Sequence, residues 1–259
     1  MNIMRGLIPS AGKGTRLYPY TKAIPKELMP LGDGTVIDQV LDRFKNGGIT
    51  DITIVISPNK CSIINYLQSG KEKMVDLSYV IQDTQDGLAK AIETSKILNK
   101  KETFVVILGD NFFLPEDALN DLIKFHYKKN ADATIGVTTV DNPSRHGMIR
   151  FDGDKIIDLI EKPVERPPSS YGIAGVYVFE PCIFDAIFQT EQGYNNEYQL
   201  TDAIKILVED GKDVFFRYIP LHIDVGTIGD LIKANKLYYS RIGGENVQKS
   251  DSICSGSSI

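Results

Sequence analysis

The chain has 259 residues, of which 42% are hydrophobic and 24% are charged, and its formal net charge is −5. This composition is typical of a globular protein with a large core, and the negative charge argues against nonspecific nucleic-acid binding. The longest apolar runs are strand-sized, no signal peptide is evident, and Cys61, Cys182 and Cys254 lack metal-type spacing. We therefore expect a soluble, cytoplasmic protein that binds neither nucleic acid nor a membrane.

The first predicted strand, residues 4–9, leads into a segment rich in glycine, cations and proline. Gly12 and Gly14 can adopt positive φ, so that main-chain N–H groups there can point at phosphate oxygens. Three cations follow: Arg16, Lys22 and Lys26. The glycine spacing fits neither a Walker loop nor a dinucleotide-binding fingerprint, and three prolines predict turns in place of a continuous helix. The segment indicates a nucleoside triphosphate site, the alternative being a proline-rich surface loop with solvated cations.

Strand-like and helical patterns then alternate through the first hundred residues. A helix begins near Val36 and ends at Gly47-Gly48, and the later patterns predict strands at 52–56, 77–82 and 103–108 and helices at 62–68 and 88–98. This order predicts a Rossmann-like α/β fold, in which a mixed, mostly parallel central sheet is flanked by helices. Ligands of such sheets bind beyond the carboxyl ends of the strands, where we expect the glycine turn, Gln82 and Asp110 to converge.

Beyond Asp110 the pattern is richer in β segments. It predicts a helix at 115–129, β segments at 133–140, 148–151, 155–160 and 173–179, helices at 181–189 and 200–209, a strand at 214–219 and a helix at 228–239. We expect one domain over residues 1–240, with a first half to about residue 112 and a second half over 113–240 that contains a smaller, β-rich part. Residues 241–259 are expected to form a flexible tail, because five serines and two more glycines follow Gly243.

Two acidic residues, Asp110 and Asp224, each lie between an apolar strand and a turn. Two carboxylates and several phosphate oxygens form the usual shell of Mg²⁺, although an isolated Asp could equally be a turn or helix-cap residue. Glu161 and Lys162 close another β segment and could bind sugar hydroxyls and a phosphate, or form a solvated ion pair.

The histidines lack metal spacing, and the sequence indicates neither a Ser/His/Asp triad nor a nucleophilic cysteine. Attack by an anionic phosphate on an α-phosphorus needs no protein nucleophile, only positioning and charge neutralisation. The residues present suit that reaction.

Six motifs, in this order, resemble the signatures of the sugar-1-phosphate nucleotidylyltransferases. They are Gly12-x-Gly14-Thr15-Arg16-Leu17-x-Pro19-x-Thr21-x-x-x-Pro25-Lys26-x-Leu28-x-Pro30, Gln82-x-x-x-Asp86-Gly87-Leu88-Ala89, Leu108-Gly109-Asp110-Asn111, Glu161-Lys162-Pro163, Glu197-x-x-Leu200-Thr201-Asp202 and Asp224-x-Gly226-Thr227. The motifs at 82–89 and 108–111 are most similar to those of glucose-1-phosphate thymidylyltransferases. The N-terminal segments 8–12 and 21–27 are more similar to those of bacterial UTP–glucose-1-phosphate uridylyltransferases. Ala11 replaces the first glycine of the Gly-Gly pair that is usual in the family.

The resemblance implies a role for each matching residue. The nucleotide would be bound by Ala11, Gly12, Gly14, Thr15, Arg16, Gln82, Gly87 and Asp110. The sugar phosphate would be bound by Lys26, Gly147, Glu161, Lys162 and Ile173. Asp110 and Asp224 would hold Mg²⁺, and the catalytic residues would be Arg16, Lys26, Asp110 and Asp224. We expect Arg16 and Lys26 to be exposed cations, whose removal lowers the rate more than the stability.

The implied reaction transfers a nucleoside monophosphate from dTTP or UTP to glucose 1-phosphate, giving dTDP-glucose or UDP-glucose and pyrophosphate. The alternatives are a UTP-specific enzyme, a relative that uses another sugar phosphate or CTP, and a non-catalytic nucleotide-sugar sensor. Because the chain stops soon after the matching region, without the further C-terminal helices that thymidylyltransferases often carry, a monomer or homodimer is expected rather than a tetramer.

Overall fold

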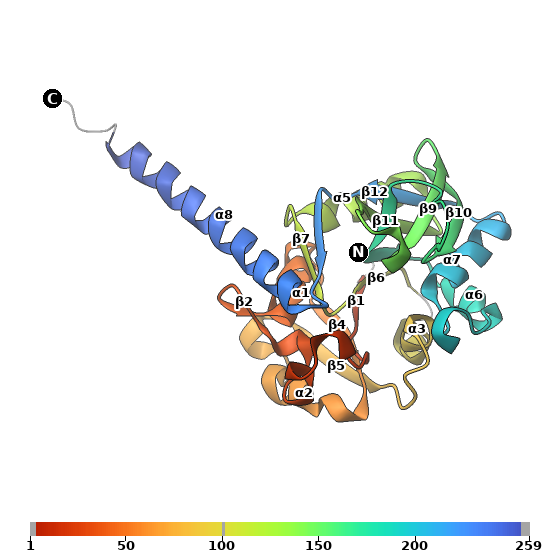
Figure 1. Cartoon of the computed structure of the whole chain (residues 1–259), viewed down its shortest axis with the longest axis horizontal. Helices are drawn as coiled ribbons and strands as arrows, with labels where there is room; N and C mark the ends of the chain where they lie inside the picture. The colour runs from red at the N-terminus through yellow and green to blue at the C-terminus, as the bar shows by residue number, and fades with distance from the viewer. Residues whose placement is uncertain (1–3, 100–101, 255–259) are drawn as a thin grey trace.

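The computed structural model describes residues 4–99 and 102–254. Within them, one mixed sheet has nine strands in the order β5-β4-β1-β6-β11-β8-β12-β10-β9 (Figure 1). Its strands are β1 (Arg5–Pro9), β4 (Asp51–Ile56), β5 (Asp76–Ile81), β6 (Phe104–Ile107), β8 (Ala133–Thr139), β9 (Gly147–Asp152), β10 (Lys155–Glu161), β11 (Tyr171–Phe179) and β12 (Val214–Tyr218). The helices are α1 (Val36–Asn46), α2 (Cys61–Leu67), α3 (Leu88–Thr94), α4 (Lys96–Asn99), α5 (Ala118–Lys129), α6 (Ile183–Gln189), α7 (Leu200–Glu209) and α8 (Ile228–Cys254).

The N-terminal part of the sheet is parallel. Strands β5, β4, β1 and β6 all run in the same direction, with Leu7 of β1 opposite Thr53 of β4 and Val106 of β6. Strand β11 then joins antiparallel to both β6 and β8, and the outer hairpin β9–β10 is also antiparallel. The predicted α/β class with a mixed sheet is therefore confirmed, and the pairing is parallel throughout β5, β4, β1 and β6.

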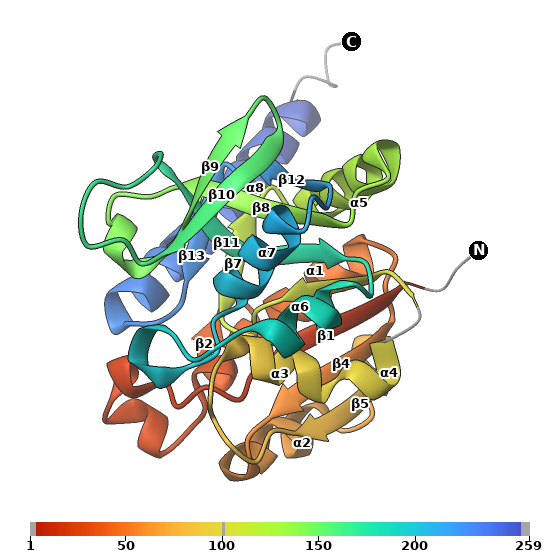
Figure 2. The ribbon, with the colours of Figure 1, turned by 90° about the vertical axis from the view of Figure 1, so that its right-hand side faces the viewer.

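Helices cover both faces of the sheet, and each face has its own apolar core. Figure 2 shows α3, α6 and α7 on one face, where Leu7, Phe104 and Phe184 belong to one buried cluster. On the other face α1 contributes Phe44 to a second cluster. The first turn of α1 is fixed by a capping box between Thr35 and Asp38. These two cores hold the strand ends, and the loops that follow them, in place.

A two-stranded ribbon connects distant parts of the chain. It consists of β7 (Asn111–Leu114) and β13 (Leu221–Asp224), and its antiparallel register places Asn111 opposite Asp224. The predicted helix start at residue 115 is wrong by three residues, because the chain pairs as β7 up to Leu114 and α5 begins only at Ala118. The predicted helix at 88–98 is also interrupted, since α3 ends at Thr94 and α4 starts at Lys96.

The last helix, α8, is longer than the sequence predicts. It continues to Cys254 and projects away from the body (Figure 1), whereas we expected the helix to end near Tyr239. The flexibility expected of residues 241–259 stays a prediction. No proline interrupts residues 228–254, so the glycines there weaken the helix without breaking it. Residues 255–259 lie outside the described part of the chain. No described helix combines the length and apolarity that crossing a bilayer requires.

Candidate active site

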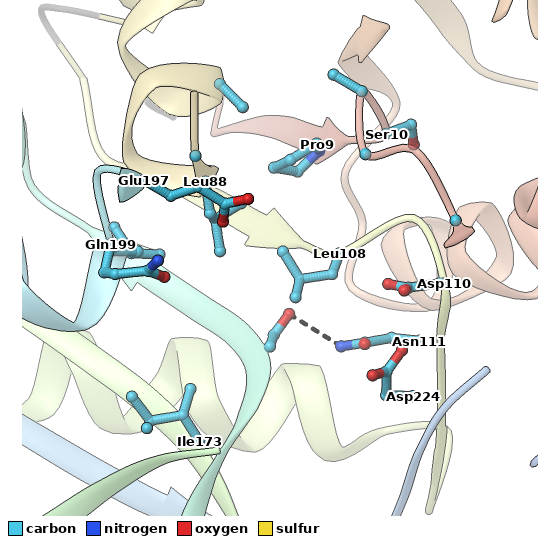
Figure 3. A pocket seen from close by; sticks show the side chains of 18 of the residues that line it. Pro9, Ser10, Leu88, Leu108, Asp110, Asn111, Ile173, Glu197, Gln199 and Asp224 are labelled. Atoms are coloured by element: carbon cyan, nitrogen blue, oxygen red, sulfur yellow. Dashed lines mark hydrogen bonds between the residues drawn. The ribbon is translucent and has the colours of Figure 1, made fainter. Parts of the chain in front are cut away.

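A cavity of about 490 Å³ lies beyond the carboxyl ends of β1 and β6, between the two halves of the chain (Figure 3). The residues to which the family resemblance assigns a role all line it: Ala11, Gly12, Gly14, Thr15, Arg16, Lys26, Gln82, Gly87, Asp110, Gly147, Glu161, Lys162, Ile173 and Asp224. Lys22, the other cation that the sequence indicated, does not line it, and its ammonium lies 5.6 Å from the centre of the Tyr18 ring. The fold thus brings these separated motifs together. The roles that the family resemblance implies for them remain predictions.

The glycine-rich turn follows β1 directly and forms one wall of the cavity. Gly14 has φ 67°, a left-handed conformation that favours glycine, and its carbonyl accepts a hydrogen bond of 2.8 Å from the Thr21 hydroxyl. A Cβ atom at Gly12 would have no heavy atom within 4 Å, so the cavity is open above that residue. Three short 3-10 turns follow, between Thr15 and Leu28, in agreement with the predicted absence of a continuous helix.

Arg16 and Asp224 form an ion pair across the cavity, with Nη2 2.9 Å from Oδ2. Burial lowers the pKa of Arg16, but the charge of Asp224 more than offsets it, so that the guanidinium is held charged. A Cβ atom at Gly226 would lie 2.5 Å from Nη2 of Arg16. Only glycine at 226 therefore leaves room for the guanidinium in this position.

Lys26 pairs with Asp110, and their side chains are only 15% and 10% exposed. The expectation that Lys26 is an exposed cation is therefore wrong, because the turn Lys26–Leu28 directs it toward the end of β6. Burial would lower the pKa of Lys26, but the charge of Asp110 raises it well above its ordinary value. The pKa of Asp110 is raised, mainly by burial and by the neighbouring carboxylate of Asp224.

The carboxylates of Asp110 and Asp224 lie beside each other. Their main chains are connected, because the Val225 N–H donates a hydrogen bond of 2.9 Å to the Asp110 carbonyl. In the described part of the chain, Oδ1 of Asp224 and Oδ1 of Asn111 are buried without a hydrogen-bond partner. Figure 3 shows Asp110, Asn111 and Asp224 grouped at one side of the cavity. Two adjacent carboxylates and unpartnered oxygens fit a divalent cation such as Mg²⁺. The described residues contain no cluster of three or more His, Cys, Asp or Glu side chains that could hold a metal ion. The remaining ligands of the cation would therefore be phosphate and water oxygens.

Gln82 and Gly87, in the segment before α3, contribute polar groups to the cavity wall. Gln82 is 5% exposed and donates to Oδ1 of Asp86 at 3.1 Å and to the Gly87 carbonyl at 3.3 Å. Gly87 has φ 126°, and a Cβ atom there would lie 2.6 Å from the Tyr198 main-chain nitrogen. Glycine is required at 87 both by its φ and by this close approach.

The opposite end of the cavity is built by the β-rich half. Glu161 accepts a hydrogen bond of 2.6 Å from the Thr201 hydroxyl and lies 2.9 Å from Nζ of Lys162. Lys162 has φ 41°, which is uncommon for a residue with a side chain, and its ammonium lies 4.5 Å from the centre of the Tyr194 ring. Carboxylate, hydroxyl and ammonium groups held in this way suit a polyhydroxylated, phosphorylated ligand.

Sequence reasoning missed several residues of the cavity wall, among them Ser10, Glu27, Arg145 and His222. His222 lies two residues before Asp224 on β13, so the two-residue period of a strand could have placed both on one face. Its Nε2 is buried without a partner in the described part of the chain, and burial lowers its pKa to about 4. No local sequence pattern indicates that Glu27 lines the cavity, because its ion-pair partner Lys60 is distant in sequence.

The chain is similar to known proteins over most of its length. A family model described as "Nucleotidyl transferase" matches residues 5–241. The nucleotidyltransferase Agl11 of low-salt glycan biosynthesis, from Haloferax volcanii, is 34% identical over 237 residues, which cover 90% of this chain and 66% of that protein. A UTP–glucose-1-phosphate uridylyltransferase of Mycoplasma genitalium is 31% identical over 96% of this chain and 95% of its own length. A crystal structure of a UDP-glucose pyrophosphorylase complexed with UDP-glucose superposes with a TM-score of 0.83, at 31% identity, over 92% of this chain and 99% of that chain.

Proposed function

The chain belongs to the nucleotidyl transferase family, and on that premise we propose that it transfers a uridylyl or thymidylyl group from UTP or dTTP to glucose 1-phosphate. The products are UDP-glucose or dTDP-glucose and pyrophosphate. The observation that carries this proposal is the meeting of Arg16, Lys26, Asp110 and Asp224 in one cavity whose far end presents Glu161 and Lys162.

In the proposed reaction, a phosphate oxygen of glucose 1-phosphate attacks the α-phosphorus of the nucleotide. A new P–O bond forms, and the bond to the bridging oxygen breaks as pyrophosphate leaves. Both substrates are anionic, so the chain must reduce their repulsion and align them. Main-chain N–H groups of the glycine turn would hold the triphosphate, Arg16 would stabilise the leaving pyrophosphate, and Lys26 and Lys162 would position the sugar phosphate.

Asp110 and Asp224 would hold Mg²⁺, which when bound neutralises charge on the phosphate oxygens. The remaining positioning comes from the chain itself. The buried Gln82 amide would bind the edge of the pyrimidine, while Glu161 and the main chain at Gly147 would contact the sugar.

A pyrophosphate-release assay with the purified chain tests this proposal directly. Each of UTP, dTTP, CTP, ATP and GTP is combined with glucose 1-phosphate and with other sugar 1-phosphates, in the presence of Mg²⁺. We expect turnover with glucose 1-phosphate and at least one of UTP and dTTP, and loss of turnover in Lys26→Gln but not in Lys22→Gln. Absence of turnover with every pair contradicts a catalytic role.

A further inference from the structure

A buried ion pair lies directly behind the phosphate-binding region, by which we mean Gly12 to Arg16 together with Lys26. Nζ of Lys60 is 2.7 and 2.8 Å from the two carboxylate oxygens of Glu27 and donates to the Ser10 carbonyl at 2.7 Å. Glu27 is 1% exposed and Lys60 is 7% exposed. One ammonium therefore connects three segments: the end of β1, the turn Lys26–Leu28, and the turn Pro58–Lys60 that follows β4.

The two partners lie on different sides of the cavity wall. Glu27 lines the cavity, whereas Lys60 does not. Glu27 also follows Lys26 in the chain, and its negative charge is among those that raise the pKa of Lys26. A carboxylate in this position would repel the phosphates of both substrates and compete with the sugar phosphate for the Lys26 ammonium.

The ion pair with Lys60 counteracts both this repulsion and this competition. Both oxygens of Glu27 are bound to Lys60, so neither is directed to Lys26 or to the open part of the cavity. Lys26 pairs instead with Asp110. Burying two charges is costly and contributes little net stability, so stability alone gives a weak reason for an ion pair at this place.

We propose that Lys60 is a positioning residue of the nucleotide site: it holds the Glu27 carboxylate in an ion pair, and thereby keeps it from pairing with Lys26 and reduces its repulsion of the phosphates. This inference rests on the proposed function for the identity of the anion. It concerns Lys60 acting through Glu27, with no contact between Lys60 and the substrate.

Two variants that break the same ion pair separate this role from a purely structural one. Lys60→Met leaves an uncompensated negative charge at the cavity wall, whereas Glu27→Gln removes that charge. Affinity for inorganic pyrophosphate in the presence of Mg²⁺ is measured by isothermal titration calorimetry, alongside the melting temperature. Lys60→Met should bind pyrophosphate at least about tenfold more weakly than the wild type, and Glu27→Gln should bind it at least as tightly. Equal weakening in both variants, or no weakening in Lys60→Met, overturns the proposal.

Three further variants complete the test. Lys60→Arg keeps the charge and should retain the wild-type affinity within about threefold. The double variant Glu27→Met with Lys60→Met removes both charges, should fold even if Lys60→Met does not, and should bind pyrophosphate as tightly as the wild type. Weaker binding by that double variant contradicts the proposal. Lys73→Met is the matched control, because it breaks the Lys73–Asp38 ion pair of 2.8 Å outside the cavity and should leave the affinity unchanged.

These measurements separate this proposal from the proposed function. A wild-type protein that binds pyrophosphate without turning over any substrate pair contradicts the transferase function, and the variants still test Lys60 by binding. A wild type that does not bind pyrophosphate overturns the proposal for Lys60.

Discussion

Nη2 of Arg16 lies 2.9 Å from Oδ2 of Asp224, although 208 positions separate them in the chain. The pair connects the glycine-rich turn of the first half to the β7–β13 ribbon of the second half. Both side chains line the cavity, and Oδ1 of the same aspartate is buried without a partner among the described residues. Arg16 therefore holds Asp224 in place through one carboxylate oxygen, while the other is left without a partner in the part of the chain that the structure describes.

Arg16→Met should reduce kcat about 10²- to 10³-fold, because a cation that stabilises the leaving pyrophosphate is lost. The Arg16 side chain is 47% exposed, so its ion pair contributes little to folding. We expect a change in the free energy of unfolding of no more than about 1 kcal/mol. Steady-state kinetics and urea denaturation measure the two effects, and a loss of activity that only follows a loss of stability would contradict the role.

Gly226→Ala should reduce activity without removing any charged group. The new Cβ atom would lie 2.5 Å from Nη2 of Arg16, so the guanidinium must shift from the position in which it pairs with Asp224. Gly229→Ala is the control, because its Cβ atom would have no heavy atom nearer than Thr227 Oγ1 at 3.7 Å and alanine favours the helix. The kcat of Gly226→Ala should approach that of Arg16→Met, whereas Gly229→Ala should keep wild-type activity. Equal activity of the two glycine variants would show that the position of the guanidinium is unimportant.

Stability should fall as the solution becomes acidic, and His222 should contribute to this fall. Burial lowers its pKa from 6.5 to about 4 in the folded protein. Between these values the unfolded chain binds more protons than the folded one, so the free energy of unfolding decreases as the pH is lowered from 6.5 to 4. His222 contributes up to about 3 kcal/mol of this change. Urea denaturation of His222→Gln across this range should give a shallower pH dependence than the wild type. An unchanged slope would mean that this imidazole is protonated equally in both states.

The parts of this protein that the sequence predicts are those with local signals. Apolar runs and helical periodicity identify the main strands and helices, and the glycines of the first turn indicate a ligand close to the main chain. Gln82 and Asp110 were found because each follows a parallel strand whose carboxyl end faces the same side of the sheet as the end of β1. Gly147 and Ile173, in contrast, were identified from the family resemblance.

Features that depend on distant partners could not be predicted in this way. Strand β7 was missed because its pairing with β13 joins residues 111–114 to residues 221–224. The Lys60–Glu27 ion pair and the burial of Lys26 also result from packing between separate segments. The continuation of α8 through residues rich in glycine and serine runs against local helix propensity.

The proposed mechanism requires Asp110 and Asp224 to bind one divalent cation together with the phosphates of the nucleotide. The most direct test is the affinity of the protein–UTP complex for Mn²⁺, measured by electron paramagnetic resonance in the wild type, Asp110→Asn and Asp224→Asn. The arrangement predicts one tightly bound Mn²⁺ per wild-type chain and an affinity at least about tenfold lower in each variant, since each removes one charged ligand. Wild-type Mn²⁺ affinity in both variants would contradict it.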